Sequence, residues 1–355
     1  MSKLIYEYYS PNGLKKSGNI TNSSRLVIKE AEKLGIGWKI EPGTQIITLT
    51  YQGQEKSYYH QVPSSTTALA LYACNNKKVT TNLLKQAGVN VPKGYRIKRN
   101  QEQDYFLEVF SFLKKPLVIK PTDGTWGENI TVGIRDEKEY LDAIELAFSY
   151  SLKKSTGAIV EEMFLGEEYR ILLTREKVLG VLKRVPANVT GNGEYSIKKL
   201  IKLKNKEDIR GKKGGDKSHL EIIIDKKMRS FLDEQELDLG FIPPKGKRIF
   251  LRKVSNTSQG GEAIDFTDKV HPSVRKIALQ AIRAIPGLSF AGVDFISSDI
   301  TQKQNNNSYV IIEINSSPGF DIHDYPYKGK NRHSAREFLL LMFPDLKEKF
   351  SLKAS

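Results

Sequence analysis

The sequence has 355 residues, of which 39% are hydrophobic and 27% charged, and its formal net charge is +15. A chain of this length can form two or three lobes, whereas a single cysteine, Cys74, excludes an internal disulfide and a cysteine-rich metal site. No apolar run approaches the length of a membrane span, and the first ten residues lack the apolar segment of a secretion signal, so we expect a cytoplasmic protein.

Taken in chain order, the periodicity of the apolar residues predicts alternating helices and strands. The first half is expected to hold a helix over residues 23–34, a strand hairpin over 46–51 and 56–61, helices over 66–74 and 80–87, a strand over 117–120, a helix over 138–150 and a strand over 158–162. The second half is expected to hold a strand pair over 170–174 and 177–185, a helix over 219–235, a strand over 249–254, a helix over 272–285, strands over 290–296 and 309–314, and a helix over 334–342. This mixture predicts an α/β fold, of the α+β kind, with several antiparallel hairpins.

Positive charge is densest over residues 198–217, which also contain Gly211, Gly214 and Gly215. This composition predicts a mobile basic loop rather than a folded nucleic-acid module. No basic strand carries the aromatic residues that stack on bases, so the charge favours an acidic small substrate over a nucleic acid.

Two apolar strands near the C-terminus each carry an acid. Asp294 lies in GVDFI, and Glu313 and Asn315 lie in IIEIN. A buried, unpaired carboxylate is costly, so an acid in an apolar strand indicates a partner for it. Glu313 and Asn315 are two residues apart and share a face, which Asp294 joins if the two strands pair. Three oxygen donors on a rigid sheet suit Mg²⁺, although a hairpin whose acids reach solvent would have the same pattern.

A lysine ends the predicted strand over 117–120 and precedes the sequence PTDGTWGEN. At a strand end, Lys120 can contact phosphate oxygens as a point charge. The loop that follows contains Asp123, Gly124 and Gly127, and its backbone N–H groups could cradle a triphosphate. Two glycines alone also fit an ordinary turn.

Residues 160–166, VEEMFLG, are expected to form a strand that leads into a linker. Backbone N–H and C=O groups there could pair with an adenine edge, and Glu168 could accept hydrogen bonds from ribose hydroxyls. Lys77, just before the predicted helix over 80–87, is a surface lysine on position alone.

Eight segments follow one another in a distinctive order. They are NKKVTTNLL from Asn76, KPTDGTWG from Lys120, VEEMFLGEEYR from Val160, KRVPANVTGNG from Lys183, LRKVSNTSQGG from Leu251, AIDFTDKVHP from Ala263, GVDFI from Gly292 and IIEINSSPG from Ile311. Together they resemble the ATP-grasp superfamily, and most closely the ATP-grasp part of cyanophycin synthetase and of bacterial bifunctional glutathione synthetase. The resemblance spans residues 23–344.

The resemblance implies an N-terminal lobe (residues 1–75) that precedes two lobes (76–160 and 161–355) sandwiching ATP. It implies ATP contacts from Lys77, Lys120, Asp123, Gly124, Gly127, Glu161, Glu162, Met163, Phe164 and Glu168, and from Lys183 and Arg184, which would lie near the phosphates or an acidic substrate. It implies that Mg²⁺, or Mn²⁺ as a substitute, is bound by Asp294, Glu313 and Asn315. Stabilisation of the transferred phosphoryl group is implied for Arg252, and contact with the acyl phosphate for Asn256, Ser258, Gly260 and Gly261.

The sequence departs from the family pattern at a few places. Asn129 replaces a usual glycine of the phosphate loop, and asparagine tolerates a positive φ better than most residues. Val254 stands where relatives usually carry a polar residue, beside a variant substrate loop at residues 257–259. The amino-acid-ligating partner domains of both relatives are not found in the sequence, so we expect one ligation rather than two linked ones.

The expected function is ATP-dependent ligation of a carboxylate to an amine through an acyl phosphate, with an amino acid or a short, acidic peptide as substrate. Two alternatives stay open. One is a γ-glutamylcysteine–glycine ligase, because residues 323–332 resemble the glutathione-synthetase version; the other is a non-catalytic, basic nucleic-acid-binding protein on the same scaffold. The expected partners are ATP and amino-acid or peptide substrates, without a membrane or a nucleic acid, and a homo-oligomer is compatible with the sequence.

Overall fold

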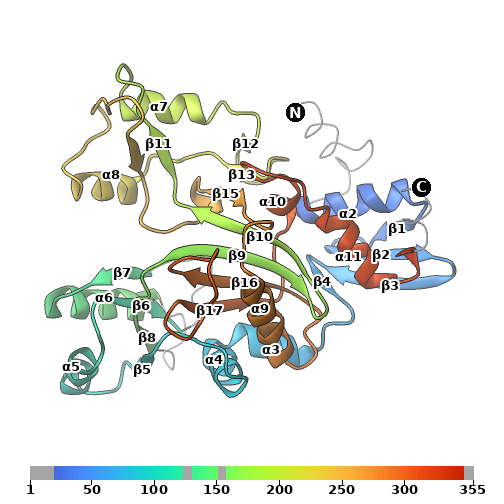
Figure 1. Cartoon of the computed structure of the whole chain (residues 1–355), viewed down its shortest axis with the longest axis horizontal. Helices are drawn as coiled ribbons and strands as arrows, with labels where there is room; N and C mark the ends of the chain where they lie inside the picture. Colours follow the sequence, from blue (N-terminus) through green and yellow to red (C-terminus); the bar gives the residue numbers. More distant parts are fainter. Residues whose placement is uncertain (1–19, 123–129, 151–156, 348–355) are drawn as a thin grey trace.

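The computed structural model describes residues 20–122, 130–150 and 157–347 (Figure 1). At its centre is an antiparallel sheet with the strand order β15-β10-β9-β16-β17. Its strands are β9 (Glu167–Thr174), β10 (Val178–Val185), β15 (Glu262–Asp265), β16 (Phe290–Ser297) and β17 (Tyr309–Asn315). We call this sheet the central sheet.

One face of the central sheet is covered by three helices, α3 (Ala68–Asn75), α4 (Lys77–Gln86) and α9 (Pro272–Ala284) (Figure 1). Alternate residues of β9 and β16 point into this core, which includes Ile171, Val293, Phe295, Ala278 and Ile282. The intervening residues of the same strands therefore point to the opposite face. That opposite face holds the charged side chains described below.

A second, smaller sheet has the strand order β5-β8-β6-β7 and packs against two helices. Its elements are β5 (Gly94–Lys98), α5 (Gln103–Phe112), β6 (Leu117–Pro121), β7 (Thr131–Ile134), α6 (Glu137–Tyr150) and β8 (Gly157–Glu162). The buried Tyr140 hydroxyl donates to the Phe106 carbonyl at 2.9 Å, so this core leaves that polar atom satisfied. Residues 163–166 run directly from β8 into β9 and link the small sheet to the central sheet.

From residue 20 on, the N-terminal unit consists of the helix α2 and a four-stranded antiparallel sheet, ordered β1-β2-β3-β4. Its elements are α2 (Asn22–Lys33), β1 (Gly37–Ile40), β2 (Ile46–Tyr51), β3 (Gln54–Tyr59) and β4 (Val62–Pro63). The C-terminal helix α11 (Ser334–Met342) lies against this unit, at the right of Figure 1. Phe338 of α11 contacts the rings of Tyr58, Phe290 and Phe320, so the two ends of the chain share one core.

Between β10 and β15 the chain makes an excursion that we call the α7–α8 unit (residues 187–251). Its elements are β11 (Asn188–Thr190), α7 (Ile197–Lys204), β12 (Arg210–Gly211), β13 (His219–Leu220), α8 (Lys226–Asp233) and β14 (Arg248–Phe250). A separate hydrophobic cluster holds this unit together, and Figure 1 shows it to one side of the central sheet. The short helices η2 (Thr257–Gln259) and α10 (Asp321–Asp324) complete the described elements.

Most of the predicted helices and strands are confirmed, but three predictions about this unit are wrong. The expected helix over 219–235 is only α8, because residues 221–225 are not helical and Asp225 starts the helix by accepting from the Met228 N–H at 2.9 Å. The expected strand over 249–254 ends at Phe250. The expected loop over 198–217 contains most of α7, whose apolar side Leu200 and Ile201 bury.

The helix α4 begins at Lys77 rather than near Thr80, because the Asn76 side chain accepts a hydrogen bond from the Val79 N–H at 3.3 Å. Lys77 therefore lies in the first turn of a helix that packs against the central sheet. Within the described ranges, every helix is too short or too polar to cross a membrane.

Candidate active site

A row of three charged residues crosses the face of the central sheet opposite α3, α4 and α9. Asp294 on β16 lies directly opposite Arg170 on β9 and Glu313 on β17. The predicted pairing of the two acidic strands is thus confirmed, and Glu313 and Asn315 share a face by strand alternation. Adjacent strands hold these groups on rigid backbone rather than on loops.

The Arg170 guanidinium grips both oxygens of the Asp294 carboxylate. Its Nε donates to Oδ1 at 2.5 Å and its Nη2 to Oδ2 at 3.1 Å. Burial alone would lower the pKa of Arg170, but Asp294, Glu313 and Glu168 outweigh it and hold that pKa above its ordinary value. Arg170 therefore stays charged and neutralises part of the negative charge that the strands bring together.

A second ion pair lies beside the first. Arg184 on β10 donates to the Glu168 carboxylate at 2.6 Å and lies 3.7 Å from Asp294. The Ser255 hydroxyl also donates to Glu168. Burial raises the pKa of Glu168, and Arg184 and Ser255 oppose the rise. The resulting network contains acids and arginines in alternation across three strands.

The two remaining predicted ligands are less buried than Asp294. Glu313 is exposed, and the Asn315 Oδ1 accepts from the Ser317 N–H at 2.8 Å. Lys77 and Glu313 line one small pocket together with Cys74. Burial and the nearby Glu313 raise the pKa of the Cys74 thiol to about 12, which disfavours its thiolate form.

In the small sheet, Lys120 on β6 and Glu161 on the adjacent β8 form an ion pair of 2.7 Å. Both side chains are largely buried, with 10% and 13% exposed. The two residues that follow Glu161 use their backbone N–H groups internally, because Glu162 donates to the Lys93 carbonyl at 2.8 Å and Met163 to the Pro116 carbonyl at 2.9 Å. Phe164 lies in the linker between the two sheets and is half-buried.

Arg252 is buried and bound to an acid in the α7–α8 unit. It donates to both oxygens of Asp225 at 2.7 and 2.8 Å and to the Ile223 carbonyl at 3.1 Å. Burial would raise the pKa of Asp225, but the hydrogen bonds from Arg252 and Met228 hold it below its ordinary value. The side chain of Arg252 is thus oriented by Asp225.

The loop over residues 256–261 is a compact turn built on an asparagine cap. The Asn256 Oδ1 accepts from the Ser258 N–H at 3.0 Å and from the Ser258 hydroxyl at 2.8 Å. Gly260 has φ +87, and a Cβ there would lie 2.8 Å from the Ile222 Cα, so only glycine fits. The Gly261 N–H donates back to the Asn256 carbonyl at 3.1 Å.

The comparisons with known proteins fit this geometry. The chain is 36% identical over 328 residues to the glutathione biosynthesis bifunctional protein GshAB of Clostridium perfringens, which covers 90% of this chain and 41% of that protein. It is 33% identical over 330 residues to the cyanophycin synthetase of Trichormus variabilis, covering 93% of this chain and 36% of that protein. Its fold matches the crystal structure of a bifunctional glutathione synthetase from Pasteurella multocida with a TM-score of 0.71, at 30% identity over 92% of this chain and 45% of that one.

The chain belongs to the ATP-grasp ligases. No protein-family model matches the chain. This ATP-grasp chain spans less than half the length of the relatives named above. The resemblance inferred from the eight segments, and the mixed α/β fold it implied, are confirmed.

Three of the predicted site residues of this ATP-grasp chain form a donor set whose chemistry fits a divalent cation such as Mg²⁺. It consists of the Asp294 and Glu313 carboxylates and the Asn315 amide oxygen, all hard oxygen donors. Among the described residues, no group of three or more histidine, cysteine, aspartate or glutamate side chains is placed to hold a metal ion. An ion held here would need further oxygens from phosphates or water, which is the usual situation of Mg²⁺ beside a nucleotide.

Sequence reasoning missed Arg170 in this ATP-grasp chain. The signal was present, because Arg170 is a charged residue inside the apolar run YRILLT, as Asp294 is in GVDFI. Three predicted phosphate-loop residues, Asp123, Gly124 and Gly127, lie outside the described residues. Lys183 on β10, also predicted, forms an ion pair with Glu167 on β9.

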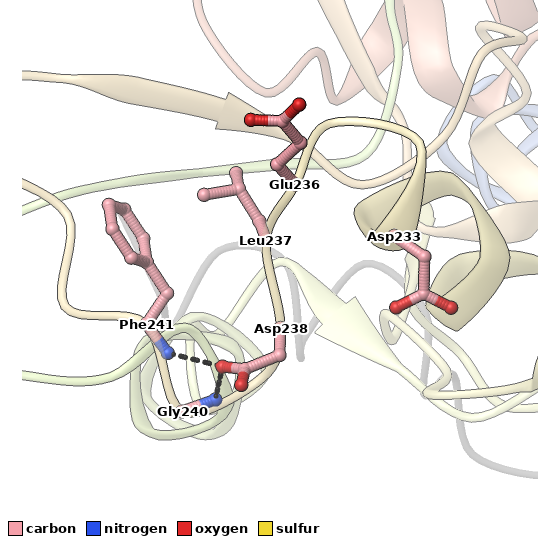
Figure 2. Close-up of a pocket in the computed structure, with 6 residues that line it drawn as sticks. All are labelled: Asp233, Glu236, Leu237, Asp238, Gly240 and Phe241. Atoms are coloured by element: carbon pink, nitrogen blue, oxygen red, sulfur yellow. Dashed lines mark hydrogen bonds between the residues drawn. The ribbon is translucent and has the colours of Figure 1, made fainter.

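A separate pocket of the ATP-grasp chain lies next to α8 (Figure 2). It is lined by Asp233, Glu236, Leu237, Asp238, Gly240 and Phe241. The Asp238 Oδ1 accepts from the N–H groups of Gly240 at 2.7 Å and Phe241 at 2.8 Å, which closes a local turn (Figure 2). Three of these lining residues are acids, and their negative charge disfavours binding of the phosphates of a nucleoside triphosphate.

Proposed function

We propose that the chain catalyses ATP-dependent ligation of a carboxylate to an amine through an acyl phosphate. The observation that supports this most directly is the row Arg170–Asp294–Glu313, which sets two carboxylates side by side on neighbouring strands. With the Asn315 amide, these groups suit a divalent ion that also binds phosphates. Bound Mg²⁺ would supply charge neutralisation on the phosphate oxygens.

In this proposal the substrate carboxylate attacks the γ-phosphoryl group and ADP leaves. The amine then attacks the acyl carbon, and phosphate leaves as the amide forms. Phosphoryl transfer asks the protein mainly for positioning and charge stabilisation. We assign Lys77 and Lys120 to the phosphates and Arg252 to the oxyanion that develops in both steps. Lys120 and Arg252 would then share these anions with their present carboxylate partners.

We place the adenine along Glu161, Glu162, Met163 and Phe164, where the small sheet runs into the central sheet. The linker position supports this, because a nucleotide there would lie between the two sheets. We assign Glu168 to the ribose, and Lys183 and Arg184 to the phosphates or to an acidic substrate. The proposed lobes meet at residues 75/76 and 160/161. The helices on either side of the first boundary, α3 and α4, both pack against the central sheet.

For the substrates we propose an amino acid or a short peptide, with Asn256, Ser258, Gly260 and Gly261 beside the acyl phosphate. The two kinds of relative carry names that point to different products, cyanophycin and glutathione. A γ-glutamylcysteine–glycine ligase is therefore the second candidate. A thiol-containing substrate that alone supports ADP release would favour this second candidate.

The decisive experiment measures ADP release against a panel of amino acids and dipeptides, with product masses recorded. We expect at least one carboxylate–amine pair to give ADP, phosphate and an amide product. The mass of that product should equal the summed masses of the two substrates minus one water. Glu313→Ala should abolish this turnover, whereas the exposed Glu145→Ala on α6 should leave it unchanged. Normal turnover in Glu313→Ala would contradict the metal assignment.

The proposal also has to exclude the nucleic-acid alternative. A basic nucleic-acid-binding protein would retard the mobility of nucleic acid in a gel, and added salt would weaken this binding strongly. Such a protein would show no ATP turnover. A salt-sensitive shift together with no ADP release from any pair of substrates would replace the ligase proposal.

A further inference from the structure

Residues of the α7–α8 unit contact the turn at Gly260 and the two residues that begin β15. The Arg210 Nη1 donates to the Gly260 carbonyl at 2.9 Å and to the Leu220 carbonyl at 2.9 Å. The His219 Nε2 accepts from the Ala263 N–H at 3.1 Å. Lys204 forms an ion pair with Glu262, which lies between these two contacts. Residues 256–263, which we call the substrate loop, are thus fixed at three successive points.

Arg210 itself is a fully buried cation in a closed setting. Its side chain is 0% exposed, and its guanidinium lies 3.5 Å from Glu207 and 3.7 Å from Glu262. The ring of Tyr327 lies 5.3 Å from the guanidinium carbon, and the Tyr327 hydroxyl donates to Glu207 at 3.0 Å. A buried arginine is costly to desolvate, so a cation placed here without access to substrate indicates a role in holding other groups.

Glycine at position 260 explains why such support is needed. The turn requires φ +87 and a close approach to Ile222, so residue 260 has no side chain with which to anchor the loop. Its carbonyl is the group that remains, and Arg210 binds that carbonyl. The same arginine ties the turn to β13 through Leu220, so the loop cannot shift without moving a strand.

We propose that Arg210 is a positioning residue for the ligation site. Through the Gly260 carbonyl it sets the path of the substrate loop and thereby aligns Asn256 and Ser258 with the carboxylate substrate, without touching substrate itself. The proposal rests on the proposed function for its kinetic consequence. The loop support that it describes is independent of any reaction.

The test compares Arg210→Met with Arg210→Lys in the full chain. Arg210→Met removes the charge and every donor, so amide hydrogen exchange over residues 256–263 should accelerate. The kcat/KM for the carboxylate substrate should fall on the order of 10²-fold, as for other misplaced catalytic groups, while the KM for ATP stays the same. Arg210→Lys keeps the charge and one donor and should restore part of both. Exposed Lys138→Met on α6 removes one charge outside the basic stretch and should change neither.

The two proposals fail differently in this experiment. If the unchanged protein releases no ADP with any substrate pair, the ligase proposal fails and hydrogen exchange alone decides the role of Arg210. Wild-type exchange over 256–263 in Arg210→Met overturns the positioning role, whatever the activity. An equal rise of the KM for ATP and for the carboxylate also overturns it, since general loosening would produce that pattern. If Arg210→Met does not fold, the same readouts on Arg210→Lys decide.

Discussion

The charged face of the central sheet carries two kinds of acidic residue, one that is buried in an ion pair and one that is exposed and free to bind a ligand. Asp294 is 4% exposed and bound at both oxygens by Arg170. Glu313, directly opposite on the next strand, is exposed. Removing the partner of a buried arginine leaves an uncompensated charge, whereas an exposed carboxylate can be removed at little cost. The two acids should therefore behave differently when mutated.

Asp294→Ala should lower the free energy of unfolding by about 3–5 kcal/mol, because Arg170 loses its bidentate partner in a buried site. Glu313→Gln should change it by less than about 0.5 kcal/mol, although we expect both variants to lose activity. Urea unfolding of the two variants, followed by circular dichroism, measures the difference. Equal destabilisation by the two substitutions would mean that the Arg170–Asp294 pair does not stabilise the fold.

Among the elements, those with a clear apolar period could be predicted from the sequence. The pair β16 and β17 is an example, because short runs rich in the β-branched Val and Ile and in Phe favour buried strands. The prediction of one helix over 219–235 was wrong because the apolar run Ile222 to Ile224 precedes the helix, whose start depends on the Asp225 side chain. The Arg170–Asp294 contact could not be derived, since β9 and β16 are far apart in sequence and their pairing depends on the whole sheet.

The start of α11 depends on a buried carboxyl group. The Asp324 oxygens accept from the N–H groups of Ser334 at 2.5 Å and Ala335 at 3.2 Å. Burial raises the pKa of Asp324 to about 7, from an ordinary 3.8, against the lowering effect of these N–H groups. Burial likewise raises the pKa of Asp321 to about 6. Both carboxyl groups lie between the N-terminal unit and the central sheet.

Asp324 should make the free energy of unfolding of the wild type fall, relative to that of Asp324→Asn, as the pH rises from about 4 to 7. In this window the folded protein keeps the Asp324 proton that the unfolded chain has released, so raising the pH favours the unfolded state. Asp324→Asn, which does not ionise, should lack this contribution, whereas the exposed Asp142→Asn on α6 should keep the pH dependence of the wild type. Urea unfolding across the pH range checks it. A slope that Asp324→Asn leaves unchanged would rule out Asp324 as its source.

At the scale of the whole molecule, the basic residues behind the net charge of +15 differ in whether they face inward or face solvent. The densest basic stretch divides into two groups. Lys204 and Arg210 face inward and bind Glu262 and the substrate loop. Lys206 and Lys212 are exposed. Only exposed charges contribute fully to the field that attracts an anionic ligand from solution, and salt screens that contribution.

If the substrate is acidic, replacing the exposed Lys206, Lys212 and Lys213 by Gln should raise its KM by about tenfold and leave the KM for ATP unchanged. The buried Lys204 and Arg210 are kept in this variant, because their loss would disturb the substrate loop instead. Steady-state kinetics at low and high salt measure the effect, and high salt should reduce the difference between variant and wild type.

A matched variant with Gln at the exposed Lys98, Lys138 and Lys303 carries the same net charge but changes other surfaces. It separates a local field from the overall charge of the molecule. An equal rise of KM in both variants would assign the attraction to net charge alone. An unchanged KM in the first variant would show that the basic stretch does not recruit the substrate, and its remaining function would be the internal support of the loop by Lys204 and Arg210.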